Sequence, residues 1–108
     1  MAKTRGTGLL MVWSDIDAEF EAEFNRWYDE EHVPRLLQVP GFLSAGRYVA
    51  RSEGQPKYLT LYEFEHAQVP EGEAWSKARA SNPWTRRMSS NLRHDVGSPG
   101  VYRRIFPN

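Results

Sequence analysis

The chain has 108 residues, a mass of 12.5 kDa and a net charge of zero from 14 basic and 14 acidic residues. Its content of 40% hydrophobic and 13% aromatic residues suits a packed core and excludes a disordered chain. The balanced charge argues against a nucleic-acid-binding protein, and the absence of cysteine excludes disulfides, thiolate metal sites and thiol nucleophiles. We expect one cytoplasmic domain spanning residues 1–108, because the apolar run Leu9–Trp13 is too short for a signal core or a membrane span.

Charge is unevenly distributed along the chain. The segment Asp15–Glu31 holds eight acidic residues with Arg26 as its only base, whereas Lys77–Arg104 holds seven bases with Asp95 as its only acid. Two solvated helix faces of opposite sign explain this pattern, and so does electrostatic complementarity across a contact between subunits. The sequence leaves both explanations open.

The first part of the chain predicts a strand followed by a helix. The apolar run Gly8–Trp13 is typical of a strand, and Ser14–Asp17 supplies N-cap candidates and acidic residues for the first turn of a helix. The ring of Pro34 clashes with the carbonyl four residues earlier, so the helix should fray or end near Val33. The apolar residues at helical spacing form one stripe: Ile16, Phe20, Phe24, Trp27 and Tyr28.

Two strands joined by a loop follow the turn Pro40-Gly41. They span Phe42–Arg51 and Tyr58–Glu65, and the loop Ser52–Lys57 between them is too long to reveal their register. In the later strand, alternation places one set of side chains on one face: Tyr58, Thr60, Tyr62 and Phe64.

The last third predicts a broken helical region and a final strand. Residues Gly72–Leu92 are helical in pattern, with a break at Asn82-Pro83, where an N-cap residue precedes a proline. After the turn Ser98–Gly100, Val101–Phe106 should form the last strand. The resulting order, β-α-β-β-α-β, is the α+β ferredoxin-like pattern, an antiparallel sheet with both helices on one face. Because the strands carry apolar residues on both sides, a second copy of the sheet is the simplest cover for the other face, which predicts a symmetric homodimer.

The segment Trp27–Pro34 is the densest in groups that transfer protons. Tyr28 and His32 lie one helical turn apart, and Glu31 falls on the apolar stripe, where a carboxylate needs a partner or a raised pKa. We therefore predict Tyr28, Glu31 and His32 as catalytic residues beside an apolar cavity. In the architectural alternative, Pro34 unwinds the last turn and His32 caps the helix end.

For several other residues the sequence is compatible with either a structural or a substrate-binding role. Arg47 and Glu63 lie in neighbouring strands and predict a cross-strand ion pair, unless Arg47 points into the pocket to hold a substrate carboxylate or enolate. Trp27, Trp84 and Met88 either fill the core or line the cavity as substrate-binding residues.

No cofactor or metal site is predicted. The three histidines, His32, His66 and His94, lack metal-binding spacing, and no glycine-rich phosphate loop is present.

The segments Trp27–Pro34, Val39–Phe42 and Arg47-Tyr48 resemble the dimeric α/β-barrel superfamily, in particular its EthD-like branch of small proteins. The resemblance spans about Gly8–Phe106. It implies subunits that pair through their sheets and a pocket between sheet and helices. In several enzymes of the superfamily a His and a Tyr near the pocket transfer protons on a carbonyl-bearing substrate; His32 matches the motif's His, and Tyr28 belongs to the same motif.

Two functions are compatible with these observations. The first is a cofactor-independent isomerase, cyclase or monooxygenase acting on a small, partly apolar carbonyl compound, with His32 as general base or acid. The second is a non-catalytic dimeric module that binds a small ligand or a partner protein. A minor alternative, haem binding or degradation, would use Trp84 and His94, although the first strand lacks the Asn that such enzymes use.

Overall fold

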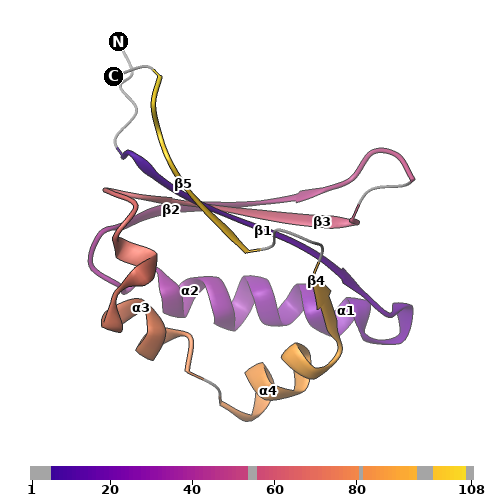
Figure 1. The fold of residues 1–108 in the computed structure, drawn as a ribbon. Coiled ribbons are helices and arrows are strands. Elements are labelled where there is room, and N and C mark those ends of the chain that lie inside the picture. Colours follow the sequence, from indigo (N-terminus) through magenta and orange to yellow (C-terminus); the bar gives the residue numbers. More distant parts are fainter. Residues whose placement is uncertain (1–5, 54–55, 81, 95–98, 107–108) are drawn as a thin grey trace.

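A computed structural model describes residues 6–53, 56–80, 82–94 and 99–106. It shows an antiparallel sheet with the helices packed on one of its faces (Figure 1). The path β2-β3-β1-β4 is joined by β5, which also pairs with β1. This is the α+β ferredoxin-like fold that the sequence predicts. The strands are β1 (Gly8–Ile16), β2 (Phe42–Val49), β3 (Tyr58–Phe64), β4 (Leu92–His94) and β5 (Gly100–Arg103).

The long helix of the first half combines three segments. These are α1 (Ala18–Trp27), the π-helical turn η1 (Tyr28–His32) and α2 (Val33–Leu36). The prediction that the helix ends near Val33 is therefore wrong. In the π-turn, the Val33 N–H bonds to the carbonyl of Tyr28, five residues back. This wider turn carries Pro34 into the first turn of α2 although proline has no N–H to donate.

Strand β1 is longer than predicted, since it continues through Ser14 to Ile16. Ser14 is 1% exposed in the sheet rather than capping a helix, and Asp17 stands at the N-cap position instead. Strand β2 ends two residues before the predicted end, and β3 ends one residue before it. The Pro40-Gly41 turn is confirmed, with Gly41 at a φ of 91°, which a side chain would strain.

A β-bulge between Phe42 and Ser44 sets the register of β2 on β3. Beyond the bulge, Arg47 lies opposite Thr60 and Ser44 lies opposite Glu63. Thr60 is buried beneath the helices, so Arg47 lies on the helix-covered face and Glu63 on the opposite face. The predicted Arg47–Glu63 ion pair is therefore wrong, because the extra residue in the bulge inverts the alternation.

The second helical region consists of η2 (Val69–Glu71), α3 (Glu73–Ala78) and α4 (Pro83–Ser90). The predicted break is confirmed, and Asn82 caps α4 by accepting a hydrogen bond from the Thr85 N–H at 2.7 Å. The chain then forms β4, which the sequence analysis missed, and β5, which is shorter than the predicted final strand. The predicted turn at 98–100 lies partly outside the described residues.

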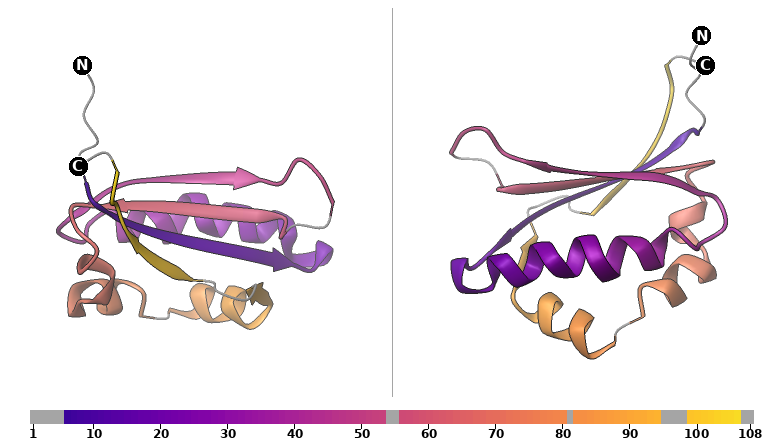
Figure 2. Two further views of the ribbon diagram at one scale, coloured as in Figure 1. Left: turned by 45° about the horizontal axis from the view of Figure 1, so that its top comes forward. Right: turned by 180° about the vertical axis from the view of Figure 1, so that it is seen from behind.

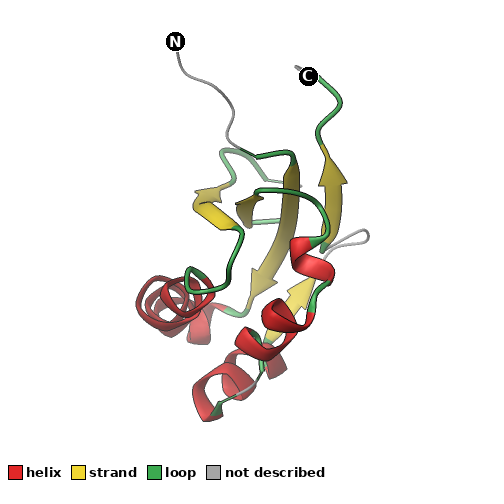
Figure 3. Cartoon of the chain, turned by 90° about the vertical axis from the view of Figure 1, so that its left-hand side faces the viewer, coloured by secondary structure: helices red, strands yellow, loops and turns green. Residues whose placement is uncertain are grey.

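Viewed from other directions, α1 runs beneath the sheet, with α3 and α4 beside it (Figure 2). The strands form one layer and the helices the other (Figure 3). Between them lies an aromatic core that includes Phe24, Phe64 and Trp75, each no more than 2% exposed. No helix within the described ranges is long and apolar enough to cross a membrane.

The uneven charge is partly neutralised inside the chain. Glu23 of α1 pairs with Arg87 of α4 at 3.0 Å, and Asp17 pairs with Arg93 of β4. The acidic and basic segments therefore meet between the first helix and the last third of the chain.

Candidate functional site

A cavity of about 200 Å³ lies between the sheet and the helices. Its walls are mostly aromatic and aliphatic, with a few polar groups. The side chains of η1 reach it from the long helix, those of β1 and β3 from the sheet, and those of α3 and α4 from the second helical region. The lining includes Trp27, Tyr28, His32, Tyr62, Trp75 and Arg79.

His32 projects from the end of the π-turn into this lining. Its imidazole stacks on the indole of Trp27, with ring centres 4.3 Å apart, and meets the edge of Tyr28 at 5.2 Å. Burial lowers the pKa of His32 from 6.5 to about 4, and the nearby Glu31 carboxylate offsets only part of that effect. None of the described residues forms a hydrogen bond with the imidazole, so a neutral ring nitrogen is free to accept a proton.

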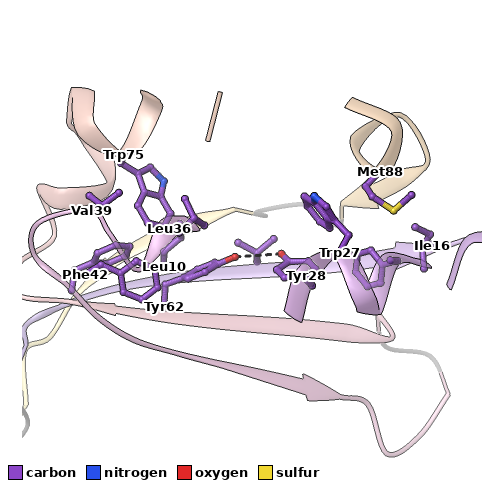
Figure 4. Packing of buried hydrophobic residues seen from close by; sticks show 13 residues of the cluster. Leu10, Ile16, Trp27, Tyr28, Leu36, Val39, Phe42, Tyr62, Trp75 and Met88 are labelled. Atoms are coloured by element: carbon purple, nitrogen blue, oxygen red, sulfur yellow. Dashed lines mark hydrogen bonds between the residues drawn. The ribbon is translucent and has the colours of Figure 1, made fainter. Parts of the chain in front are cut away.

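Two tyrosine hydroxyls meet at the same cavity. The hydroxyl of Tyr62 on β3 donates to that of Tyr28 on η1 over 3.5 Å, and the two side chains point toward each other in Figure 4. Tyr62 is 2% exposed, and burial raises its pKa well above 10. The phenol of Tyr62 therefore remains protonated near neutral pH and donates to Tyr28, whose own hydroxyl can donate a hydrogen bond to an oxygen in the cavity.

Glu31 belongs to a polar network beside the cavity and is not part of its lining. Its carboxylate pairs with Arg35 at 2.6 Å. Arg35 also donates to the carbonyls of Ala78 and Ala80 and to the Thr85 hydroxyl. The network thus fastens α2 to the segment between α3 and α4, which closes one side of the cavity.

Three of the predicted substrate-binding residues lie outside the lining. Arg47 donates to Asp29 and Asn25, each at 2.8 Å, and its guanidinium lies 4.5 Å from the ring centre of Tyr28. Trp84 donates to Glu23 at 3.1 Å, and Met88 is fully buried in the core. Trp27 is the predicted binding residue that the structure does bring into the lining, together with Tyr28 and His32.

The lowered pKa of His32 should make stability depend on pH. Between pH 6.5 and about 4 the unfolded chain binds a proton that the folded chain does not, so this contribution is complete above 6.5 and is lost as the pH falls toward 4. We expect a loss on the order of 3 kcal/mol from this residue. Urea unfolding at pH 7 and pH 4.5 should show a smaller pH effect for His32→Gln than for the unchanged chain. If the free energy of unfolding changes equally with pH in the two proteins, the lowered pKa of His32 is contradicted.

No family model and no curated protein matches the chain. Solved structures do match it. A variant of SnoaB, a cofactor-independent oxygenase from Streptomyces nogalater, is 15% identical, covering 95% of this chain and 100% of that one, with a TM-score of 0.63. HapK from Hahella chejuensis is 7% identical, covering 94% and 95%, with a TM-score of 0.64. A variant of MhuD with two manganese protoporphyrin IX molecules bound per active site is 12% identical, covering 94% and 97%, with a TM-score of 0.63.

The chain has the fold of the dimeric α+β barrel proteins. At these identities the likeness shows the fold alone. The cavity of this chain is small: its volume of about 200 Å³ is below the range of roughly 300–1,000 Å³ that ligand pockets usually span. A porphyrin does not fit the cavity as the described residues shape it. The His94 side chain, named for the haem alternative, lies outside the described part of the structure. Within the described ranges, no group of three acidic or histidine side chains could hold a metal ion.

Sequence reasoning missed several residues of the site. Tyr62 was placed on the correct face of its strand, but without a register nothing indicated that it would meet Tyr28. Trp75 and Arg79 are one turn apart on α3, a spacing visible in the sequence, yet the break before α4 concealed which face they present.

Proposed function

We propose that the chain is a cofactor-independent enzyme that removes a proton from a carbon next to a carbonyl group of a small, partly apolar substrate. The observation that carries the proposal is the His32 imidazole, which is uncharged, lacks a hydrogen-bond partner among the described residues, and lines an aromatic cavity. Such an imidazole is a base held on a rigid element beside an apolar site.

In the proposed step, a ring nitrogen of His32 takes the proton of the C–H bond. The electron pair of that bond passes to the carbonyl oxygen, giving an enolate. The hydroxyl of Tyr28, which accepts the hydrogen bond from Tyr62, can donate its own proton in a hydrogen bond to this oxygen. The new imidazolium can return the proton to another carbon in an isomerisation, or the enolate can attack a second carbonyl of the same molecule in a cyclisation. In an oxygenation, dioxygen is the co-reactant of the enolate.

Further parts of the proposal concern residues around the cavity and the family branch. Glu31 would act by holding the wall of the cavity through Arg35, and Arg47 by holding the ring of Tyr28. Trp84 and Met88 would support the cavity from the core. The segment Trp27–Pro34, together with the fold, supports placing the chain near the EthD-like branch.

The test is deuterium incorporation from D2O into a panel of small lactones and cyclic ketones, followed by proton NMR. Exchange should require His32, and the matched control is His66→Gln, because His66 is an exposed histidine outside the cavity. The proposal fails if His32→Gln exchanges every compound as fast as the unchanged chain. Ligand binding without exchange would support the non-catalytic module instead.

We also propose that a second copy of the chain covers the outer face of the sheet. A groove of about 550 Å³ on that face is lined by apolar side chains including Leu9, Met11 and Leu61, and Tyr48 and Tyr102 are about half exposed there. In sedimentation equilibrium we expect twice the chain mass, and the monomer mass for Leu61→Lys. The control Leu37→Lys changes an exposed leucine outside this groove and should remain dimeric. A monomer mass for the unchanged chain would refute the dimer.

A further inference from the structure

The cavity carries a charge that the proposed proton transfer does not use. Arg79 stands at the C-terminal end of α3, is exposed, and contributes to the cavity lining. Among the described lining residues it is the single formally charged group, and no lining residue is a carboxylate. The described walls of the cavity therefore carry one positive charge and are otherwise neutral and mostly apolar.

The guanidinium of Arg79 has no carboxylate partner among the described residues. Several other arginines of the described chain are neutralised by carboxylates: Arg35 pairs with Glu31, and Arg87 pairs with Glu23. Arg47 likewise pairs with Asp29. Arg79 thus differs from the arginines that stabilise the fold, since its donors remain available to an external anion.

The charge of Arg79 acts on the interior of the cavity as well as on solvent. It contributes to lowering the pKa of His32, and it opposes the rise in the pKa of Tyr62 caused by burial. The Arg79 N–H also bonds to the Trp75 carbonyl at 3.0 Å, so the backbone that carries this charge is fixed one turn from an aromatic wall of the cavity.

We propose that Arg79 binds a carboxylate of the substrate at the mouth of the cavity, so that the substrate is a small aromatic or cyclic carboxylic acid. The ring of such an acid lies among Trp27, Tyr62 and Trp75, and its carboxylate receives hydrogen bonds from the guanidinium. The cavity volume of about 200 Å³ limits the acid to one ring or a compact pair of rings. This inference rests on the proposed function for the identity of the site, but binding alone can test it.

The probes are benzoate and benzamide, which have nearly the same shape and differ in charge. Binding is followed by the ring C–H signals of His32 in proton NMR, which report occupancy of the cavity. We expect benzoate to bind about 10- to 100-fold more tightly than benzamide, the effect of one charge-assisted hydrogen-bonded pair. Arg79→Gln should abolish this preference, and Arg79→Lys should retain part of it.

The matched control is Lys77→Gln, which removes a positive charge from an exposed position of the same helix outside the cavity and should leave the preference unchanged. The inference is overturned if benzoate does not shift the His32 signals, if both probes bind equally, or if Arg79→Gln keeps the preference. If benzoate binds more tightly than benzamide but no compound exchanges protons, the carboxylate site at Arg79 is upheld and the proposed enzymatic activity is refuted. If exchange depends on His32 but benzoate and benzamide bind equally, the enzymatic activity is upheld and the carboxylate site is refuted.

Discussion

Replacing His32 with glutamine should slow the catalysed proton exchange by about 100- to 10,000-fold, the usual contribution of a positioned general base. Glutamine keeps a polar side chain of similar reach but cannot take up a proton near neutral pH. Within the described lining, no carboxylate is present to replace the imidazole as base. A loss of less than about threefold would indicate that another group takes the proton.

The same assay has a pH signature that separates catalysis from structure. Because the pKa of His32 is about 4, its imidazole is in the basic form throughout the neutral range. The value of kcat/KM should therefore be flat through the neutral range and fall about tenfold per unit once the pH drops below about 4. The His66→Gln control should reproduce this profile, whereas a profile with its midpoint at 6.5 would show that burial does not lower the pKa of His32.

Replacing Trp75 with alanine should lower the free energy of unfolding by about 3–5 kcal/mol, as is typical of removing a large aromatic side chain from a core. Trp75 is 2% exposed, and its indole contacts the rings of Phe42, Tyr62 and Phe64 at centre distances of 5.0–5.6 Å. These contacts hold the short helix α3 on the sheet. The loss is a large part of the roughly 5–15 kcal/mol that stabilises an ordinary domain.

The comparison for this prediction is Trp84→Ala, since Trp84 has the same side chain but is only partly buried on α4. Urea unfolding at pH 7 should give a clearly smaller loss for Trp84→Ala than for Trp75→Ala. Similar losses of unfolding free energy in the two variants would mean that Trp75 does not hold α3 on the sheet.

The sequence was sufficient for the order of the main elements, although not for the short strand β4, because the hydrophobic periodicity of the longer strands and helices depends on local spacing. The alternation correctly grouped Thr60, Tyr62 and Phe64 on one face of β3, which the structure shows to be the covered face. The pair Asn82-Pro83 correctly indicated the start of α4. Two local irregularities were not predictable in this way. The bulge after Phe42 inserts one residue and moves Arg47 to the covered face, and the π-turn carries the long helix past Pro34.

Only the residues that the long first helix contributes to the candidate site could be predicted from the sequence. Tyr28 and His32 share a face because they are one turn apart, which the sequence shows directly. Tyr62 and Arg79 come to the cavity from other elements, so their placement depends on strand register and helix docking. Glu31 was expected in the cavity, but it lies outside the lining, next to Arg35. A buried carboxylate needs a partner of opposite charge, and the ion pair with Arg35 supplies it.

The π-turn has a consequence for how proteins of this kind are compared with one another. A π-turn contains one residue more than the α-helical turn it replaces, so losing a single residue between Tyr28 and His32 would restore an ordinary helix. The side chains on either side of the turn would keep their orientation, because the wider turn is what absorbs the extra residue. The side chains within the turn, His32 among them, would be the ones displaced. An insertion or deletion of one residue at this turn can therefore change which side chains reach the cavity while the fold stays the same.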